Sequence, residues 1–192
     1  MRKLLLLLVW ILALDSTPTP LRAMSREAGE KPVVVDTGIR IVYQSCSNWC
    51  WAADIEMLSG KYGQPTTQCG VVAARFQDPS CCAAAACYGG CNQGANSPET
   101  VTTTLQAHGI QSIYEPSYLS SAQLRAWLDA GSPVLAATVP HAFIVSGYRK
   151  IDGQYSYLVL DPFPLVGAHW VSYTELRNYG GYEWAFSWYA FE

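Results

Sequence analysis

The chain has 192 residues, of which 50% are hydrophobic and 12% aromatic, so it can form a globular domain with a packed core. It has 12 basic and 15 acidic residues and a net charge of −3, and its basic residues are scattered singly, which argues against nucleic-acid binding. Seven cysteines are too many for a reducing compartment unless a metal binds them, so either disulfides or zinc must account for them.

The first 23 residues have the pattern of a secretory signal peptide. Residues 1–3 are a short basic segment, residues 4–14 are an unbroken apolar run, and small residues such as Ala23 follow. The apolar run is too short to cross a bilayer, which needs about 20 residues. We therefore expect the signal to be removed without leaving a membrane anchor, and the mature protein to be secreted or periplasmic.

After a polar N-terminal arm at residues 24–38, residues 39–192 are expected to form a single domain. Apolar spacing and capping residues predict helices near residues 50–62, 68–76, 98–108 and 120–130, and a small capped helix from Ser172. In the first helix, Trp51, Ile55 and Leu58 are assigned to the apolar side and Asp54 to the polar side. β-Branched and aromatic segments predict strands at 33–35, 39–43, 133–139, 142–148, 155–160 and 183–191. Helices followed by antiparallel strands indicate an α+β fold.

Six cysteines could pair in 15 ways, and the sequence does not choose among them. These disulfide candidates are Cys46, Cys69, Cys81, Cys82, Cys87 and Cys91. The cluster at 81–91 could instead hold zinc, but no histidine is interleaved and export favours oxidation, so we expect disulfides that hold the loop at 77–97. An odd count leaves one cysteine over. Cys50 is the best candidate for a free thiol, because tryptophans flank it and a predicted helix begins there.

Three motifs resemble those of the papain-like cysteine peptidases. Gln44 precedes Cys50 by six positions, His141 opens a His-Ala pair followed by apolar residues and Gly-Tyr, and Asp161 ends a predicted strand. The resemblance spans residues 39–191. It implies a helical left part, an antiparallel β-sheet or barrel on the right, and an active-site cleft between them. Plant and lysosomal papains have asparagine in place of the aspartate, so the chain is more similar to bacterial branches, including secreted effector peptidases.

Acyl-transfer chemistry gives each of these residues a role. A free thiol, with a pKa of about 8.5, is mostly protonated at neutral pH, and the start of a helix favours the thiolate of Cys50. His141 would act as base and later protonate the leaving amine, and Asp161 would orient its ring. Gln44 would donate to the oxyanion. His169 is a rival base, but it lacks the strand pattern that surrounds His141.

The expected reaction is hydrolysis of a peptide or protein substrate through a thioester, without a metal or organic cofactor. Three alternatives stay open. The same triad could catalyse another acyl transfer, such as deamidation or transpeptidation. The protein could be a cell-wall peptide amidase, although the aspartate that usually precedes the cysteine of such enzymes is absent here. It could also be a catalytically silent binding protein. Neither the substrate sequence nor the oligomeric state follows from the residues.

Overall fold

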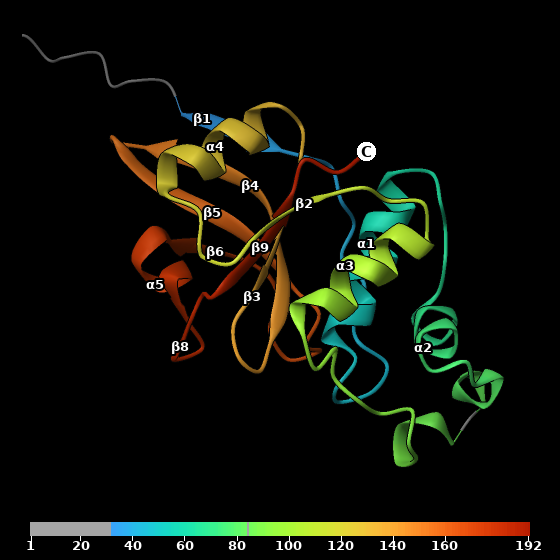
Figure 1. Cartoon of the computed structure of the whole chain (residues 1–192). Coiled ribbons are helices and arrows are strands. Elements are labelled where there is room, and N and C mark those ends of the chain that lie inside the picture. Colours follow the sequence, from blue (N-terminus) through green and yellow to red (C-terminus); the bar gives the residue numbers. More distant parts are fainter. Residues whose placement is uncertain (1–31, 84) are drawn as a thin grey trace, which may run out of the picture.

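The computed structural model describes residues 32–83 and 85–192, so the predicted signal peptide at 1–23 lies outside the described residues. The first half of the chain forms α1 (Cys50–Lys61), α2 (Gln68–Phe76) and α3 (Pro98–Ala107), which gather on one side of the molecule (Figure 1). Most strands come from the second half and form a sheet on the other side (Figure 1). The predicted α+β class, with helices before strands, is confirmed.

Side-chain caps determine where most of the helices begin. Ser97 caps α3, and Ser120 and Ser172 form capping boxes at the starts of α4 (Ser121–Asp129) and α5 (Tyr173–Arg177). The starts of these three helices agree with those predicted near residues 98, 120 and 172. Within residues 32–83 and 85–192, no helix has the length and apolar character needed to cross a membrane.

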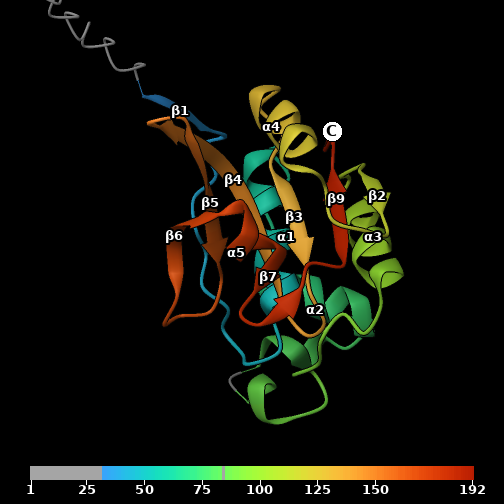
Figure 2. The ribbon, with the colours of Figure 1, turned by 90° about the vertical axis from the view of Figure 1, so that its left-hand side faces the viewer.

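The sheet has seven strands, and all of its pairings are antiparallel. Six strands follow the order β2-β9-β3-β4-β5-β6, and β1 pairs with β4 (Figure 2). The order ends at β2 and β6, so the described strands form an open sheet and not a closed barrel. A separate hairpin contains β7 (Asn178–Tyr179) and β8 (Tyr182–Glu183). The strands of the large sheet are β1 (Val33–Asp36), β2 (Ile113–Glu115), β3 (Val134–Ala137), β4 (Ala142–Ile151), β5 (Gln154–Asp161), β6 (Gly167–Ser172) and β9 (Phe186–Tyr189).

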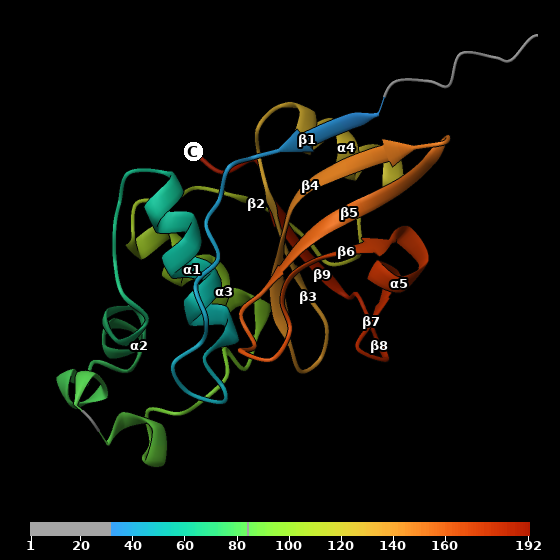
Figure 3. The same cartoon turned by 180° about the vertical axis from the view of Figure 1, so that it is seen from behind.

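One predicted strand is wrong and another is wrong in part. Residues 39–43 form no strand and instead run from β1 to the start of α1 (Figure 3). On one side, β4 pairs with β3 over its first residues and with β1 over its later ones, so this side of β4 has no place left for residues 39–43. The strand predicted at 183–191 is divided, because β8 belongs to the small hairpin and β9 to the large sheet, with Trp184 and Ala185 between them. Strand β1 itself lies in the segment that the sequence assigned to the N-terminal arm at 24–38.

The central strands are buried on both faces, which explains their nearly continuous apolar sequences. In β3, Leu135 faces the core beneath α1, α2 and α3, whereas Val134 and Ala136 face a second core beneath α4 and α5. In β4, Ile144 and Val145 divide between the two cores in the same way. Because side chains alternate along a strand, each strand contributes to both cores. Helix α1 packs directly against β4 and so connects the two parts of the molecule.

Six cysteines form three disulfides in the helical part. The bonds are Cys46–Cys87, Cys69–Cys82 and Cys81–Cys91. They hold the segment at 77–97, in which the described residues form two short 3-10 helices, η1 (Pro79–Cys82) and η2 (Ala86–Tyr88). Each such bond typically stabilises a fold by about 2–4 kcal/mol, chiefly by restricting the unfolded chain. A cysteine in a disulfide has no thiolate, so these six cysteines in their bonded form cannot provide the zinc site that was the alternative interpretation of the sequence.

Thiol counting should check this pattern. In the denatured, unreduced protein, iodoacetamide should modify one cysteine, and peptide mapping should identify it as Cys50. After reduction, all seven cysteines should react. Two or more reactive thiols before reduction, or modification of a different cysteine, would contradict the pairing.

Gly147 marks a close approach between β4 and β1. A Cβ atom at this position would overlap the carbonyl oxygen of Val35, and the β4–β5 register shifts here in a bulge. We expect Gly147→Ala to lower the free energy of unfolding by about 1–3 kcal/mol, measured by urea denaturation. The matched control is Gly60→Ala in α1, where a Cβ meets nothing within 4 Å and should be neutral or slightly stabilising. Equal stability of the two variants would contradict the predicted clash.

Candidate active site

Cys50 is the first residue of α1 and lines a cleft between the helical part and the sheet. Trp49 is the N-cap residue, and no side chain in the described part of the chain caps this helix. The first backbone N–H groups of α1 are therefore left without side-chain partners next to the thiol. Together with the positive end of the helix dipole, these groups favour a negative charge on Cys50.

The residues around Cys50 are fixed by hydrogen bonds to a second loop. The indole N–H groups of Trp49 and Trp51 donate to carbonyl groups of the loop at 91–93, over 2.8 and 3.1 Å. Asn48 adds two further hydrogen bonds to the same loop. The two tryptophans that flank Cys50 in the sequence thus hold its backbone in place, which positions the thiol independently of any substrate.

His141 immediately precedes β4, and Asp161 is the last residue of β5. These strands pair antiparallel, with Ile144 opposite Leu160, so both side chains reach the same end of the sheet. The Nε2 atom of His141 lies 2.9 Å from Oδ1 of Asp161. A turn steadies the histidine, because its backbone N–H donates to the Oγ1 of Thr138 over 3.2 Å. The sheet register therefore brings together two residues that are 20 positions apart in the chain.

His141 and Asp161 stabilise each other's charged forms. Burial alone would lower the pKa of His141, but hydrogen bonds to Asp161 and Cys50, and their negative charges, raise it to about 10. Burial acts on Asp161 in the opposite sense and would raise its pKa. Hydrogen bonds from His141, Tyr179 and the backbone N–H of Phe163 outweigh this, so the pKa of Asp161 is lowered. At neutral pH the site accordingly contains an imidazolium and a carboxylate.

Tyr179 is a member of the site that the sequence did not predict. Its hydroxyl donates to Oδ2 of Asp161 over 2.7 Å, and its ring is stacked on that of His141, with centroids 6.5 Å apart. Burial, followed by the hydrogen bond to Asp161, raises the pKa of Tyr179 well above its usual range, so the phenol stays a donor. Tyr179 belongs to the small β7–β8 hairpin. The sequence could have indicated this hairpin through the adjacent Gly180-Gly181 pair, which is common in hairpin turns.

His169, the rival base, lies on the far side of Asp161. Its Nε2 is 3.2 Å from the hydroxyl of Tyr179, and its Nδ1 donates to the carbonyl of Gly167 over 2.9 Å. It does not line the cleft that contains Cys50. His169 can therefore reach the reacting groups only through Tyr179 and Asp161.

Gln44 lies in the loop that leads to Cys50, but its side-chain amide already donates hydrogen bonds within that loop. The side-chain nitrogen donates to the carbonyls of Cys46 and Ser47, over 3.0 and 2.8 Å. Its oxygen is buried and has no hydrogen-bond partner among the described residues. Its backbone N–H donates to the carbonyl of Pro162, just after Asp161, over 2.8 Å. An oxyanion role for this residue requires the amide to turn from the loop carbonyls toward a substrate.

The cleft has a volume of about 460 Å³, and both Cys50 and His141 line it. One wall comes from the helical part and includes Pro98 and Val101, and the other comes from the sheet and includes Phe186. The described lining is mainly apolar and bears no charged side chain other than the site residues. Walls of this kind can pack against apolar parts of a bound ligand.

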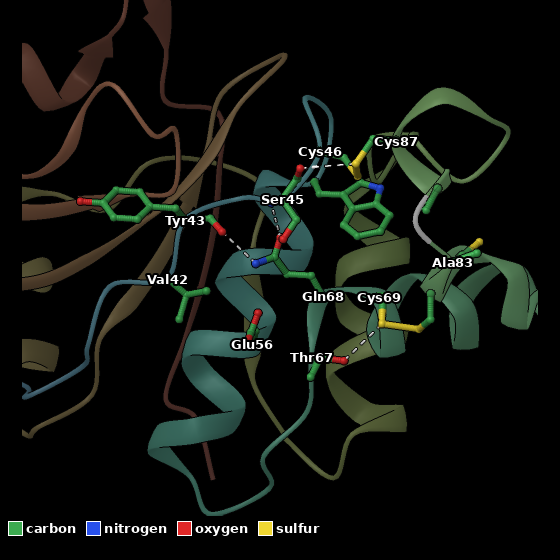
Figure 4. Close-up of a pocket in the computed structure, with 14 residues that line it drawn as sticks. Val42, Tyr43, Ser45, Cys46, Glu56, Thr67, Gln68, Cys69, Ala83 and Cys87 are labelled. Carbon is green, nitrogen blue, oxygen red and sulfur yellow. Dashed lines mark hydrogen bonds between the residues drawn. A yellow bond between two sulfur atoms is a disulfide. The ribbon is translucent and has the colours of Figure 1, made fainter.

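A second pocket, of about 400 Å³, lies between the loop that precedes Cys50 and the segment held by the disulfides, and is shown in Figure 4. Its lining includes the sulfur atoms of the disulfides and Gln68, which bonds the backbone of Tyr43 and Ser45 (Figure 4). None of Cys50, His141 and Asp161 lines it. Gln68 therefore supports the loop that begins at residue 43 and takes no part in the chemistry.

The fold and the site define a papain-like cysteine peptidase. A family model described as papain-like cysteine protease AvrRpt2 matches residues 33–168, which is most of the chain. The chain belongs to this family. The matched segment contains Cys50, His141 and Asp161 and ends before Tyr179.

Two solved structures show the same fold. The peptidase domain of Streptococcus ComA, a bi-functional ABC transporter involved in a quorum-sensing pathway, is 12% identical, with a TM-score of 0.54, over 78% of this chain and 96% of that one. A double-glycine-motif protease from an AMS/PCAT transporter, solved with a leader peptide, is 12% identical, with a TM-score of 0.51, over 80% of this chain and 91% of that one. The search of curated proteins found no match. The predicted family and enzyme class are confirmed, and they support a peptide or protein substrate.

Proposed function

We propose that the protein is an exported thiol peptidase that hydrolyses peptide bonds with a triad of Cys50, His141 and Asp161. One observation carries the proposal: the single cysteine outside the three disulfides lines the same cleft as a histidine that is bonded to a carboxylate. The disulfides, together with the signal-like N-terminus at residues 1–23, support a secreted or periplasmic destination.

The hydrogen bond to Asp161 assigns the two nitrogens of His141. Because Nε2 donates to Asp161, Nδ1 is left to exchange protons with Cys50 and the substrate. The thiolate attacks the peptide carbonyl carbon, Nδ1 protonates the leaving amine, and the C–N bond breaks to leave a thioester. A water molecule then gives a proton to Nδ1 and attacks the thioester, the acid departs, and the thiolate–imidazolium pair is restored.

The tetrahedral intermediates need donors for their oxyanion. The backbone N–H of Cys50 is one candidate, at the uncapped start of α1. The amide of Gln44 is the second, once a substrate carbonyl competes with the carbonyls of Cys46 and Ser47 for its protons. Removing one such donor typically costs about 3–4 kcal/mol in the barrier.

The proposal is tested by incubating the mature protein with a peptide library and identifying the products by mass spectrometry, with Cys50→Ala as control. We expect cleaved peptides that are absent with the variant, and an irreversible thiol-directed epoxide that labels Cys50 alone and stops cleavage. Deamidated or ligated products would indicate another acyl transfer, and cleavage confined to cell-wall stem peptides would indicate an amidase. No product at all would favour a silent binding protein, and cleavage by Cys50→Ala would refute the nucleophile.

A further inference from the structure

Asp54 is a fully buried acid one helical turn beyond Cys50. Its residue exposure is 0%, and both carboxyl oxygens have no hydrogen-bond partner among the described residues. Residues four apart share one face of a helix, and helical side chains lean toward the N-terminus, so this carboxyl lies beneath Cys50. The prediction that Asp54 takes the polar side of the helix is therefore wrong, because α1 is packed between β4 and α2.

Three ionisable groups on the surrounding elements interact electrostatically with this carboxyl. They are Cys50 on α1, His141 before β4 and Asp161 at the end of β5. An ionised carboxylate that is buried without hydrogen bonds is strongly unfavourable. Burial, and then the negative charge of Cys50, raise the pKa of Asp54 well above its ordinary value, and the imidazolium of His141 only partly opposes them.

We propose that Asp54 is a positioning residue for the nucleophile: a buried carboxyl group held neutral beneath Cys50, whose retained proton allows the thiolate to persist. The inference rests on the proposed function. A charge on Asp54 and a charge on Cys50 oppose each other, and so would a charge on Asp54 and the oxyanion formed from the substrate. The working state thus contains the thiolate, the imidazolium of His141 and the carboxylate of Asp161, while Asp54 stays uncharged.

The protonation of Asp54 can be observed directly. At neutral pH, the infrared spectrum of the whole mature protein should contain the carbonyl stretch of a protonated carboxylic acid, a band that carboxylates lack. Asp54→Asn should remove this band. The control is Asp152→Asn, at an exposed position in the β4–β5 turn, and it should leave the band in place. If the unmodified protein has no such band, or if Asp54→Asn retains it, the proposal is overturned.

The pH dependence of thermal stability provides a second test, because the proposal determines the direction in which the Tm difference must change. Above a pH of about 4 the unfolded chain releases the proton of Asp54, whereas the folded protein keeps it. Rising pH therefore favours unfolding of the unmodified protein relative to Asp54→Asn. The Tm of the variant minus that of the unmodified protein should increase between about pH 5 and pH 8. A difference that stays constant over this range would overturn the proposal.

A purely structural acid would change stability without affecting the thiol. We therefore compare the pH dependence of the alkylation of Cys50 by iodoacetamide, which needs no substrate. The unmodified protein should show an additional alkaline transition that Asp54→Asn lacks, whereas Asp152→Asn should match the unmodified protein. Identical profiles for Asp54→Asn and the unmodified protein would overturn the coupling to Cys50. Failure of the proposed function, by contrast, would appear as absence of peptide cleavage with the alkylation profiles still distinct.

Discussion

Replacing His141 by alanine should lower kcat/KM for peptide hydrolysis by about a thousandfold, whereas His169→Ala should lower it by less than about tenfold. In the proposed mechanism, the first variant loses the group that protonates the leaving amine and accepts a proton from water. Its loss also removes the positive charge that stabilises a thiolate on Cys50. Initial rates of one good peptide substrate, measured across a range of concentrations, give both values.

The small effect expected of His169 follows from its contacts. Its two ring nitrogens are engaged by Tyr179 and by the carbonyl of Gly167, and neither faces the cleft. His169 can influence the reaction only by holding Tyr179, which in turn donates to Asp161. Loss of His169 should therefore disturb the orientation of Asp161 without removing a group that transfers protons.

Two controls separate chemistry from misfolding. Both histidine variants should keep the near-ultraviolet circular dichroism spectrum of the unmodified protein, and in both the three disulfides should remain. Epoxide labelling of Cys50 should be slow in His141→Ala and nearly unchanged in His169→Ala. An inactive His169→Ala variant together with an active His141→Ala variant would mean that the base is misassigned.

Local signals predicted most of the helices, because their ends depend on nearby residues. The helix predicted at 68–76 agrees with α2, and α3 and α4 begin, behind the caps Ser97 and Ser120, close to the predicted residues 98 and 120. Pairing partners of strands are not local. Residues 39–43 have strand-like composition but pair with no strand, whereas β1 pairs with β4. Hydrophobic pattern alone could not distinguish these two segments.

Within the site, sequence spacing located the residues that share a motif, and it missed those that meet only through the fold. Cys50, His141 and Asp161 were predicted from their surroundings, and the structure places them together. Tyr179 reaches Asp161 from a separate hairpin. Asp54 looked like an ordinary polar helix residue, because nothing in a helical pattern says that both sides of the helix will be covered. Disulfide pairing also depends on the fold, since six cysteines allow 15 pairings.

Changing Asp161 provides the final test of how His141 is held. We expect Asp161→Ala to lower kcat/KM by about a hundredfold and Asp161→Asn by about tenfold. The Oδ1 atom of Asp161 accepts hydrogen bonds from His141 over 2.9 Å and from the backbone N–H of Phe163 over 2.8 Å. The amide oxygen of asparagine can accept both bonds, whereas alanine offers no acceptor.

The surroundings of the other carboxylate oxygen can also accommodate asparagine. Tyr179 now donates to Oδ2, which would become an NH₂ group in Asp161→Asn. The phenol oxygen can accept from that amide if its own hydrogen turns to Nε2 of His169, 3.2 Å away. This nitrogen can accept, because Nδ1 of His169 supplies the hydrogen bonded to Gly167. The variant therefore leaves no donor unpaired, and the loss of charge is the main change.

That loss of charge should be visible in the pH profile. The hydrogen bond and charge of Asp161 help to raise the pKa of His141 to about 10, and in the proposed mechanism the imidazolium protonates the leaving amine. Activity of the unmodified enzyme should therefore decline as pH rises through about 10. In both variants the alkaline decline of kcat/KM should occur at lower pH, and the shift should be larger for alanine, which removes the hydrogen bond as well as the charge. An unchanged decline, or asparagine as damaging as alanine, would mean that Asp161 neither charges nor orients His141.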